Sequence, residues 1–250
     1  MKLLVKVIKS WVLAFVYPRP LIGVIYLPRF FKHWYQYLKL IGAEKIGVLD
    51  LQPCLGDWST HTPFDAHYFY QGAWLARRVI ASRAIKHVDI GSSVLTISVL
   101  SAQVETVFVD YRPLKVSLTG LTSIAGNILD LSFADNSIDS LSCLHVIEHI
   151  GLGRYGDPLN SQGSVNAASE LQRVVSRGGN LFISLPIGRE RICFNAHRVH
   201  SPISVVMMFP HMKLIEFSFV DDVGQFHENN PIENAIGLEY GCGMFYFEKL

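Results

Sequence analysis

The sequence predicts an α/β fold with a doubly wound, mostly parallel sheet and an antiparallel strand at its edge. From residue 85 onward, short apolar runs alternate with segments of helical periodicity, which is typical of a parallel sheet covered by helices. A glycine follows the first apolar run, where a helix should begin. The last two apolar runs, 213–220 and 243–249, have no helix-length periodic segment between them, and this favours an antiparallel pair at the sheet edge.

The predicted elements follow one another in a regular order. Residues 68–84 carry apolar side chains near helical spacing, at Trp74, Leu75, Val79 and Ile80, and predict a helix that leads into the core. We expect strands at 85–90, 106–110, 140–144 and 180–185, and helices at 94–102, 114–122 and 165–176. A pair of glycines at 178 and 179 should stop the last of these helices.

The composition narrows the classes of protein. Half of the 250 residues are hydrophobic and 17% are charged, so the chain can bury a sizeable core and should not be disordered. The 22 basic and 21 acidic residues give a formal charge of +1, which carries no signature of nucleic-acid binding. The 4 cysteines are far apart and form no C-x-x-C pair, which indicates free thiols in a reducing compartment and no zinc site.

The first 42 residues contain basic side chains and no acidic ones. Pro18 and Pro20 interrupt their apolar run, which leaves a stretch far shorter than the ~20 residues of a membrane span. No small-residue cleavage site of a signal peptide follows it. Two interpretations stay open: amphipathic elements on an anionic membrane surface, or an arm packed on the domain or on a second subunit.

We therefore divide the chain into three parts. These are an N-terminal arm or membrane-surface segment (1–42), a leading segment with a helix packed on the core (43–84), and the main domain (85–250). The expected location is cytoplasmic, with peripheral contact at the inner face of the cell membrane in the first interpretation of the arm. The oligomeric state stays open.

The stretch HVDIGSS, residues 87–93, predicts a strand, a tight turn and the start of a helix. Gly91 would let the backbone approach a ligand in the crevice at the carboxyl ends of the strands. Asp110 ends the next strand, close to the ~20-residue spacing expected for a carboxylate that binds two ribose hydroxyls. The second and third glycines of a dinucleotide-binding turn are absent, which disfavours NAD. Asp89 is expected to help hold a cationic or zwitterionic ligand such as S-adenosylmethionine, directly or through water, with Ser92 beside it.

Residues 126–150, GNILDLSFADNSIDSLSCLHVIEHI, resemble the class I methyltransferase segment written G-D-x-x-x-L-P-F-x-D-x-S-F-D. The similarity extends in order over 85–190. It implies a Rossmann-like domain that binds S-adenosylmethionine. Asn127 stands where the family commonly has an acid that contacts the adenine amino group, and an amide oxygen can also accept from that group. Ile128, beside it, is expected to contact the cofactor as well.

A closer resemblance involves the runs HVIEHIGLGRYGDP at 145–158 and FNAHR at 194–198, together with residues 67–74. These look like the family known as domain of unknown function 268, whose members often occur with polysaccharide biosynthesis genes. The resemblance spans most of the chain after about residue 50. It implies a methyltransferase-like fold and a small-molecule or glycan acceptor, without a firm substrate.

Three residues after the 140–144 strand are candidate catalytic groups: His145, Glu148 and His149. A histidine beside a carboxylate suits removal of a proton from an acceptor hydroxyl; the alternative is that these residues brace a helix. His145 and His149 would share one face of a helix. The strand should end near His145, however, so we predict no metal site.

Two further segments supply candidate substrate-binding residues. Arg154 and Tyr155 lie in a glycine-rich loop that could close over an anionic acceptor. His197 and Arg198 follow the 180–185 strand on the expected ligand side of the sheet.

The sequence leaves three hypotheses of function. The first is an S-adenosylmethionine-dependent methyltransferase acting on a sugar or polysaccharide precursor. The second is a catalytically inactive binding or scaffold protein of glycan assembly, which the missing glycines and Asn127 motivate. The third is a nucleotide-sugar-modifying enzyme that uses the same crevice for another ligand.

Overall fold

A computed structural model describes residues 23–250 of the chain, which divides into two compact units. The first ends at Phe64 and the second comprises Asp65–Leu250. Each unit is described by itself. The interrupted apolar run around Pro18 lies outside the described residues.

The described part of the first unit contains one longer helix, α2 (Leu27–Leu38), with the short 3-10 turns η1 (Gly23–Tyr26) and η2 (Val48–Asp50). Pro28 lies in the first turn of α2, where a proline does not disturb helical hydrogen bonds. No residue of this helix is buried. Among the described residues, no helix has the length and apolarity that a membrane crossing requires.

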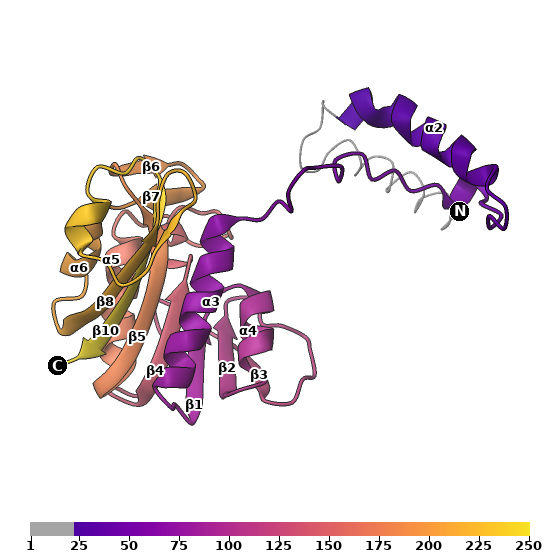
Figure 1. The fold of residues 1–250 in the computed structure, drawn as a ribbon. Coiled ribbons are helices and arrows are strands. Elements are labelled where there is room, and N and C mark those ends of the chain that lie inside the picture. The colour runs from indigo at the N-terminus through magenta and orange to yellow at the C-terminus, as the bar shows by residue number, and fades with distance from the viewer. Residues whose placement is uncertain (1–22) are drawn as a thin grey trace. The chain divides into compact units, whose positions relative to one another are not determined.

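The second unit is built on one eight-stranded sheet with the order β3-β2-β1-β4-β5-β10-β8-β9 (Figure 1). Its strands are β1 (Lys86–Ile90), β2 (Glu105–Asp110), β3 (Leu121–Ala125), β4 (Ile138–Leu144), β5 (Val175–Ile187), β8 (Met212–Val220), β9 (Phe226–His227) and β10 (Gly241–Lys249). The neighbours from β3 to β5 pair in parallel, whereas β10 runs antiparallel to β5 and β8. The predicted fold class is therefore confirmed. The antiparallel β10 lies inside the sheet, between β5 and β8, because the last strand returns next to β5.

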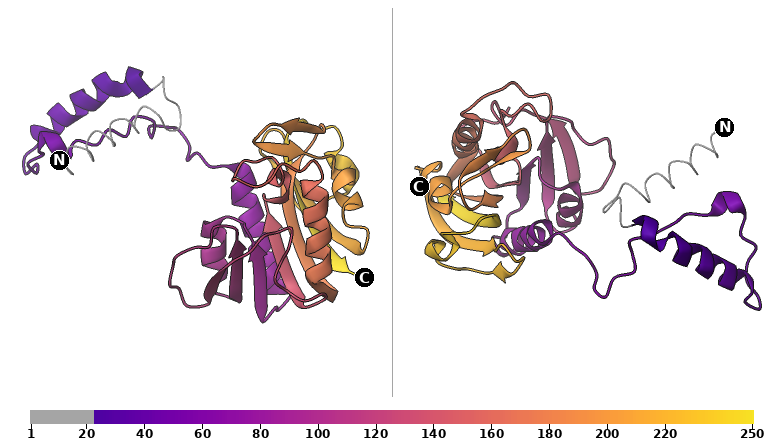
Figure 2. Two further views of the ribbon diagram at one scale, coloured as in Figure 1. Left: turned by 180° about the vertical axis from the view of Figure 1, so that it is seen from behind. Right: turned by 90° about the horizontal axis from the view of Figure 1, so that it is seen from above.

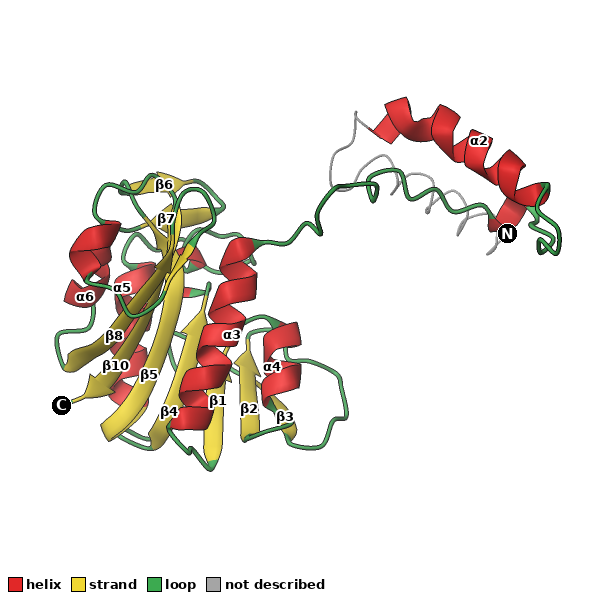
Figure 3. Cartoon of the chain, viewed as in Figure 1, coloured by secondary structure: helices red, strands yellow, loops and turns green. Residues whose placement is uncertain are grey.

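Helices cover both faces of this sheet (Figure 2). The first face packs against α3 (Ala66–Ala81) and α4 (Val94–Leu100), and the opposite face against α5 (Gly163–Val174). The short helix α6 (Pro202–Met207), the 3-10 turns η3 (Ile147–His149) and η4 (Ile232–Ala235), and the hairpin of β6 (Arg191–Cys193) and β7 (His197–Val199) complete the unit (Figure 3).

Side chains alternate between the two faces of the sheet along each strand, and each face has its own apolar core. Val107 and Val109 of β2 pack on the α5 side, whereas Phe108 between them packs with Trp74 on the α3 side. Successive side chains of a strand point to opposite faces. Each strand therefore contributes to both cores, and this fixes the register that brings the strand ends to one edge.

Helix α3 has three of the four predicted core residues in its buried face. Trp74, Leu75 and Val79 are buried, but Ile80 is 51% exposed. The buried face is set by contacts with β8, where Glu216 accepts hydrogen bonds from Trp74 Nε1 at 3.0 Å and from Arg78 Nη2 at 2.7 Å. Ile80 lies beyond that face, so its inclusion in the apolar stripe was wrong.

The predicted helix at 114–122 is also wrong. Residues 111–120 form a loop, and β3 (Leu121–Ala125) follows as a parallel neighbour of β2. Gly120 has φ of +80°, which ends any local helix, and Thr122 and Ile124 have the β-branched shape that suits a strand. Pairing with the free edge of β2 outweighs the weak helical pattern.

Candidate functional site

The turn between β1 and α4 requires a glycine. Gly91 has φ of +66°, a conformation that L side chains rarely adopt. A Cβ at this position would lie 3.3 Å from Val146 Cγ2 and 3.7 Å from Asp110 Oδ2. The Gly91 amide donates a 2.9 Å hydrogen bond to the Val109 carbonyl. The strand ends therefore approach one another closely, with Asp110 directly beside the turn.

Asp89 holds this turn in place through hydrogen bonds to its carboxylate. Its carboxylate is fully buried and accepts hydrogen bonds from the Ser92 amide at 3.0 Å, from the Ser92 hydroxyl at 2.6 Å and from the Ser142 hydroxyl. It lines neither of the two cavities described below. The contact expected between Asp89 and a ligand, direct or through water, stays a prediction. In this structure the group positions the turn on which a ligand would rest.

A histidine extends the network around Asp89. Because the Ser142 hydroxyl donates to Asp89, it accepts from His87 Nε2 at 2.8 Å, and His87 Nδ1 accepts from the Ser140 hydroxyl at 2.8 Å. Burial lowers the pKa of His87 to about 3, so the imidazole is neutral. Burial likewise raises the pKa of Asp89 to about 6, although the serine donors oppose that shift.

A smaller cavity of about 330 Å³ lies between the turn and the segment after β3. Four of the predicted cofactor-binding residues line it: Gly91, Asp110, Asn127 and Ile128. Asp110 Oδ1 accepts from the Arg112 amide at 2.6 Å, and Asn127 Oδ1 accepts from the Leu129 amide at 3.0 Å. The carboxylate and the amide are thus both held in place.

A larger cavity of about 740 Å³ adjoins the smaller one. The two share Gly91, His145, His149 and Tyr155 in their linings. The larger cavity also contains the predicted residues Ser92, Glu148, Arg154 and His197. The structure therefore gathers the predicted catalytic and substrate-binding groups, except Arg198, in the larger cavity, and His145, His149 and Tyr155 also line the predicted cofactor cavity. Ser92, which was predicted to bind the cofactor, lines the larger cavity instead.

His145 directly follows β4 and has a φ of +55°, an uncommon conformation that clusters at functional sites. Its Nδ1 lies 2.8 Å from Glu148 Oε1. Burial would lower the pKa of His145, but the Cys242 sulfur and the Glu148 carboxylate outweigh it and hold this pKa well above its usual value. Burial would also raise the pKa of Glu148, yet the contact with His145 lowers it.

His149 presents a different nitrogen to the cavities. Its Nδ1 lies 2.6 Å from the Ala196 carbonyl oxygen, which can only accept, so Nδ1 carries the proton. Nε2 then has the free lone pair and lies 3.7 Å from Glu148 Oε1. Both rings therefore approach Glu148 Oε1, His145 through Nδ1 and His149 through Nε2, whereas only His149 also donates to the Ala196 carbonyl.

The glycine-rich loop after η3 is held by Asp157, which accepts from the Gly151 amide at 2.6 Å and the Tyr155 amide at 3.2 Å. The ring of Tyr155 lies 4.9 Å from the Arg112 guanidinium and 5.1 Å from that of Arg154. This cation–π arrangement places Tyr155 at the boundary of both cavities.

Arg198 does not line either cavity, which corrects its assignment to substrate binding. It is 6% exposed and donates to the Ile150 carbonyl at 2.6 Å and the Asn160 carbonyl at 3.0 Å. The guanidinium satisfies backbone acceptors at both ends of the loop, so Arg198 keeps the loop in place.

The cavity residues to which the sequence analysis gave no role include His67, Tyr68 and Tyr240. Asp65 caps α3 by accepting from the Tyr68 amide at 3.2 Å, and this N-cap signal could have placed the helix start, and hence His67, at the ligand edge. Tyr240 lies in a loop before β10, where no periodic pattern marks it.

Several solved structures share this fold at low sequence identity. The N-methyltransferase NodS from Bradyrhizobium japonicum WM9, in complex with S-adenosylhomocysteine, has a TM-score of 0.52 at 14% identity and covers 88% of this chain and 98% of its own. A putative sarcosine dimethylglycine methyltransferase from Galdieria sulphuraria has a TM-score of 0.52 at 13% identity, covering 72% and 85%. The [4+2]-cyclase SpnF has a TM-score of 0.53 at 11% identity, covering 72% and 80%. The fold is that of the class I methyltransferases.

The sequence itself matches the family described as "Caenorhabditis protein of unknown function, DUF268" over residues 81–230. This match covers more than half of the chain, so the protein belongs to that family. No curated protein sequence matches the chain.

The environment of Asp89 generates a prediction for stability. The folded state binds the Asp89 proton more tightly than the unfolded state, because burial raises its pKa from 3.8 to about 6. The free energy of unfolding should therefore fall as the pH rises from about 4 to about 6.5, by about 3 kcal/mol from this group. Asp89→Asn should lack this decrease in urea denaturation series at several pH values. Parallel curves for the wild type and the variant would contradict the assignment.

Proposed function

We propose that the protein is an S-adenosylmethionine-dependent methyltransferase that acts on a small polyhydroxylated acceptor, such as a sugar or a polysaccharide precursor. The observation that carries this proposal is the junction of two cavities at Gly91, His145 and His149. One cavity has the groups for an adenosyl moiety and the other has the groups for an acceptor. The shared wall is where a methyl group would pass between them.

The smaller cavity fits S-adenosylmethionine. The position of Gly91 leaves open the space that a Cβ would fill next to Asp110. Asp110 Oδ2 lies on this side, and a carboxylate can accept hydrogen bonds from both ribose hydroxyls. Ile90, Val109 and Ile128 give the cavity an apolar wall suited to the faces of an adenine ring. Asn127 lines the same cavity, and its amide can form a hydrogen bond with the adenine edge.

The bound cofactor would supply an electrophilic methyl group on a sulfonium. The chain's own residues hold the acceptor in line with that methyl group, and this positioning accounts for much of the catalysis of such reactions. We assign the role of general base to His149, whose free Nε2 lies at the shared wall. Glu148 Oε1, 3.7 Å away, would stabilise the imidazolium that forms when His149 takes the acceptor proton.

The lining of the larger cavity supports a polyhydroxylated acceptor. It combines the aromatic rings of Tyr68 and Tyr240 with the charged side chains of Asp65 and Arg154. Aromatic faces with a few polar groups orient a ligand that has both apolar and hydroxyl-bearing surfaces. His197 adds a neutral nitrogen, because burial lowers its pKa.

Binding of S-adenosylhomocysteine tests the cofactor site. The expected affinity is in the micromolar range by titration calorimetry, and Asp110→Asn should weaken it about 10- to 100-fold because a charge-assisted hydrogen bond contributes about 1.5–3 kcal/mol. Glu105→Gln is the matched control, since Glu105 is the first residue of the same strand β2 and lies at its opposite end. No heat with the wild type, or an equal loss in both variants, would contradict the proposed site.

Methyl transfer is then measured with cofactor labelled in its methyl group and a panel of sugars and nucleotide sugars. Label recovered in a sugar supports the proposal. Tight binding of S-adenosylhomocysteine without transfer to any acceptor, together with competition by a nucleotide sugar, would favour a different reaction in the same crevice.

We further propose that the first 42 residues make peripheral contact with the inner face of the cell membrane. In the described part, the spacing of α2 places Leu27, Phe31, Trp34 and Leu38 on one side of the helix. The opposite side of the helix carries the polar residues Arg29, Lys32 and Gln36. A basic amphipathic helix with aromatic residues is typical of elements that lie on anionic lipid surfaces.

Vesicle sedimentation tests this contact. The full chain should sediment with phosphatidylcholine vesicles that contain phosphatidylglycerol, and less with phosphatidylcholine alone. Lys32→Glu with Lys39→Glu should lower binding at least about tenfold, since each basic residue near such a surface contributes about 1 kcal/mol. Lys115→Glu with Lys213→Glu makes the same charge change at exposed positions of the second unit and should bind as the wild type does. Equal binding by the two double variants would overturn the proposal.

A further inference from the structure

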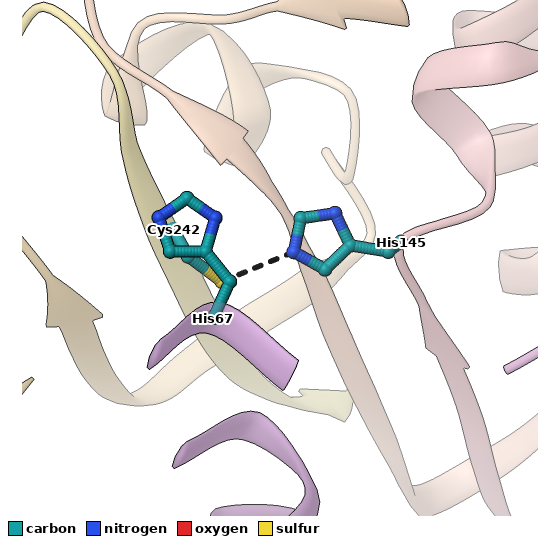
Figure 4. Close-up of side chains that lie close together, drawn as sticks. All are labelled: His67, His145 and Cys242. Carbon is teal, nitrogen blue, oxygen red and sulfur yellow. Dashed lines mark hydrogen bonds between the residues drawn. The ribbon is translucent and has the colours of Figure 1, made fainter. Parts of the chain in front are cut away.

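Three side chains from distant parts of the sequence converge at the base of the larger cavity. His67 comes from the first turn of α3, His145 follows β4 and Cys242 belongs to β10 (Figure 4). One nitrogen of each histidine and the cysteine sulfur all lie within 4.8 Å of one another. We infer that His67, His145 and Cys242 form a binding site for a zinc ion.

The distance between His145 and Cys242 agrees with tetrahedral zinc, and the His67 nitrogen lies within 4.8 Å of both donor atoms. Zinc binds cysteine sulfur at about 2.3 Å and histidine nitrogen at about 2.0–2.1 Å, so a tetrahedral angle places the two donor atoms about 3.6 Å apart. His145 Nε2 and Cys242 Sγ are 3.4 Å apart. One thiolate with two imidazoles is a donor set that favours zinc over magnesium or calcium, which prefer oxygen ligands.

The second nitrogen of His145 supports this inference independently. Nδ1 lies 2.8 Å from Glu148 Oε1, and a carboxylate can only accept, so Nδ1 carries a proton. Nε2 faces the Cys242 sulfur at 3.4 Å, and its lone pair would bind zinc once the metal displaces any proton there. Histidines that bind metals almost always donate their other ring N–H to a carboxylate or carbonyl in this way. The hydrogen bond fixes both the tautomer and the orientation that a metal ligand needs.

The buried carboxylate points to the same conclusion. Glu148 is 0% exposed, lines the cavity, and its Oε2 has no hydrogen-bond partner among the residues that the structure describes. A buried carboxylate with an unsatisfied oxygen is costly. A divalent cation held by His145 would offset that cost, because it places two positive charges next to the Glu148 carboxylate.

A competing interpretation joins Cys242, His145 and Glu148 as a nucleophilic cysteine with its base. Cys242 is fully buried and is absent from the cavity lining, whereas His67 and His145 belong to it. A nucleophilic sulfur must be accessible to a substrate in the cavity. A buried sulfur can still bind a metal ion that lies between it and the cavity. The burial of Cys242 therefore favours the metal site.

Three protein ligands leave a fourth position that faces the cavity, the pattern of reactive zinc sites. If the protein is the proposed methyltransferase, this position suits an acceptor hydroxyl, because zinc makes a bound hydroxyl easier to deprotonate. His149 is the nearby group that would take the proton. Only this role in the reaction rests on the proposed function. The metal site itself is inferred from the side-chain contacts alone.

Metal binding by the full chain tests the inference without cofactor or acceptor. The stripped protein should take up about one zinc ion per chain in competition with a chromogenic chelator. Cobalt(II) in its place should give the charge-transfer absorption of a cobalt–thiolate bond. Cys242→Ser should abolish that absorption and His67→Asn should weaken zinc binding. Glu148→Gln should weaken it about 10- to 100-fold, as loss of a partner that orients a ligand does.

Two control variants separate this site from adventitious binding. Cys193→Ser removes another cysteine, and His197→Asn removes another histidine of the same cavity; both should keep wild-type zinc affinity. A wild-type protein that binds no zinc, or shows no cobalt–thiolate absorption, would overturn the site, as would equal binding by Cys242→Ser and the wild type. Since none of these readouts uses S-adenosylhomocysteine, failure of the cofactor site would leave them unaffected.

Discussion

The buried carboxylate of Asp89 is the constraint on which the rest of the site depends. It binds the Ser92 amide and hydroxyl on the turn and the Ser142 hydroxyl on β4. One group thus joins the end of β1, the start of the following helix and the neighbouring strand. The Ser92 hydroxyl in turn accepts from the Leu144 amide at 2.9 Å. The turn that this network holds carries Gly91, which lines both cavities, and Ser92, which lines the larger one. The geometry of both cavities therefore depends on the Asp89 network.

Neighbouring histidines differ in role because their partners differ. His87 is enclosed by serine hydroxyls and stays neutral. His145 lies between a carboxylate at Nδ1 and a sulfur at Nε2, which fixes the orientation of its ring. His149 donates to a backbone carbonyl and leaves its other nitrogen at the cavity wall. The same fold occurs in proteins named as methyltransferases and in one named as a cyclase, so function has to be argued from such local contacts.

The sequence could predict the parts of the fold and site that depend on local pattern. Alternating apolar runs located β1, β2, β4 and β5, and the glycine and acid after adjacent strands predicted that Gly91 and Asp110 meet, because parallel strands end at one edge. It could not predict β3, whose half-exposed residues become a strand only by pairing with β2. Nor could it show that Arg198 turns to backbone carbonyls, or that Cys242 of β10 lies next to His145, because both depend on contacts between distant segments.

The central claim is that the turn at Gly91 joins an adenosyl cavity to an acceptor cavity. The most direct measurement is a crystal structure of the protein with S-adenosylhomocysteine bound. The account predicts ribose hydroxyls on the Asp110 carboxylate, adenine between Ile128 and Asn127, and the sulfur directed at the wall that His149 shares with the larger cavity. A ligand whose adenine lies in the larger cavity beside Tyr240, with nothing bound at Asp110, would contradict it.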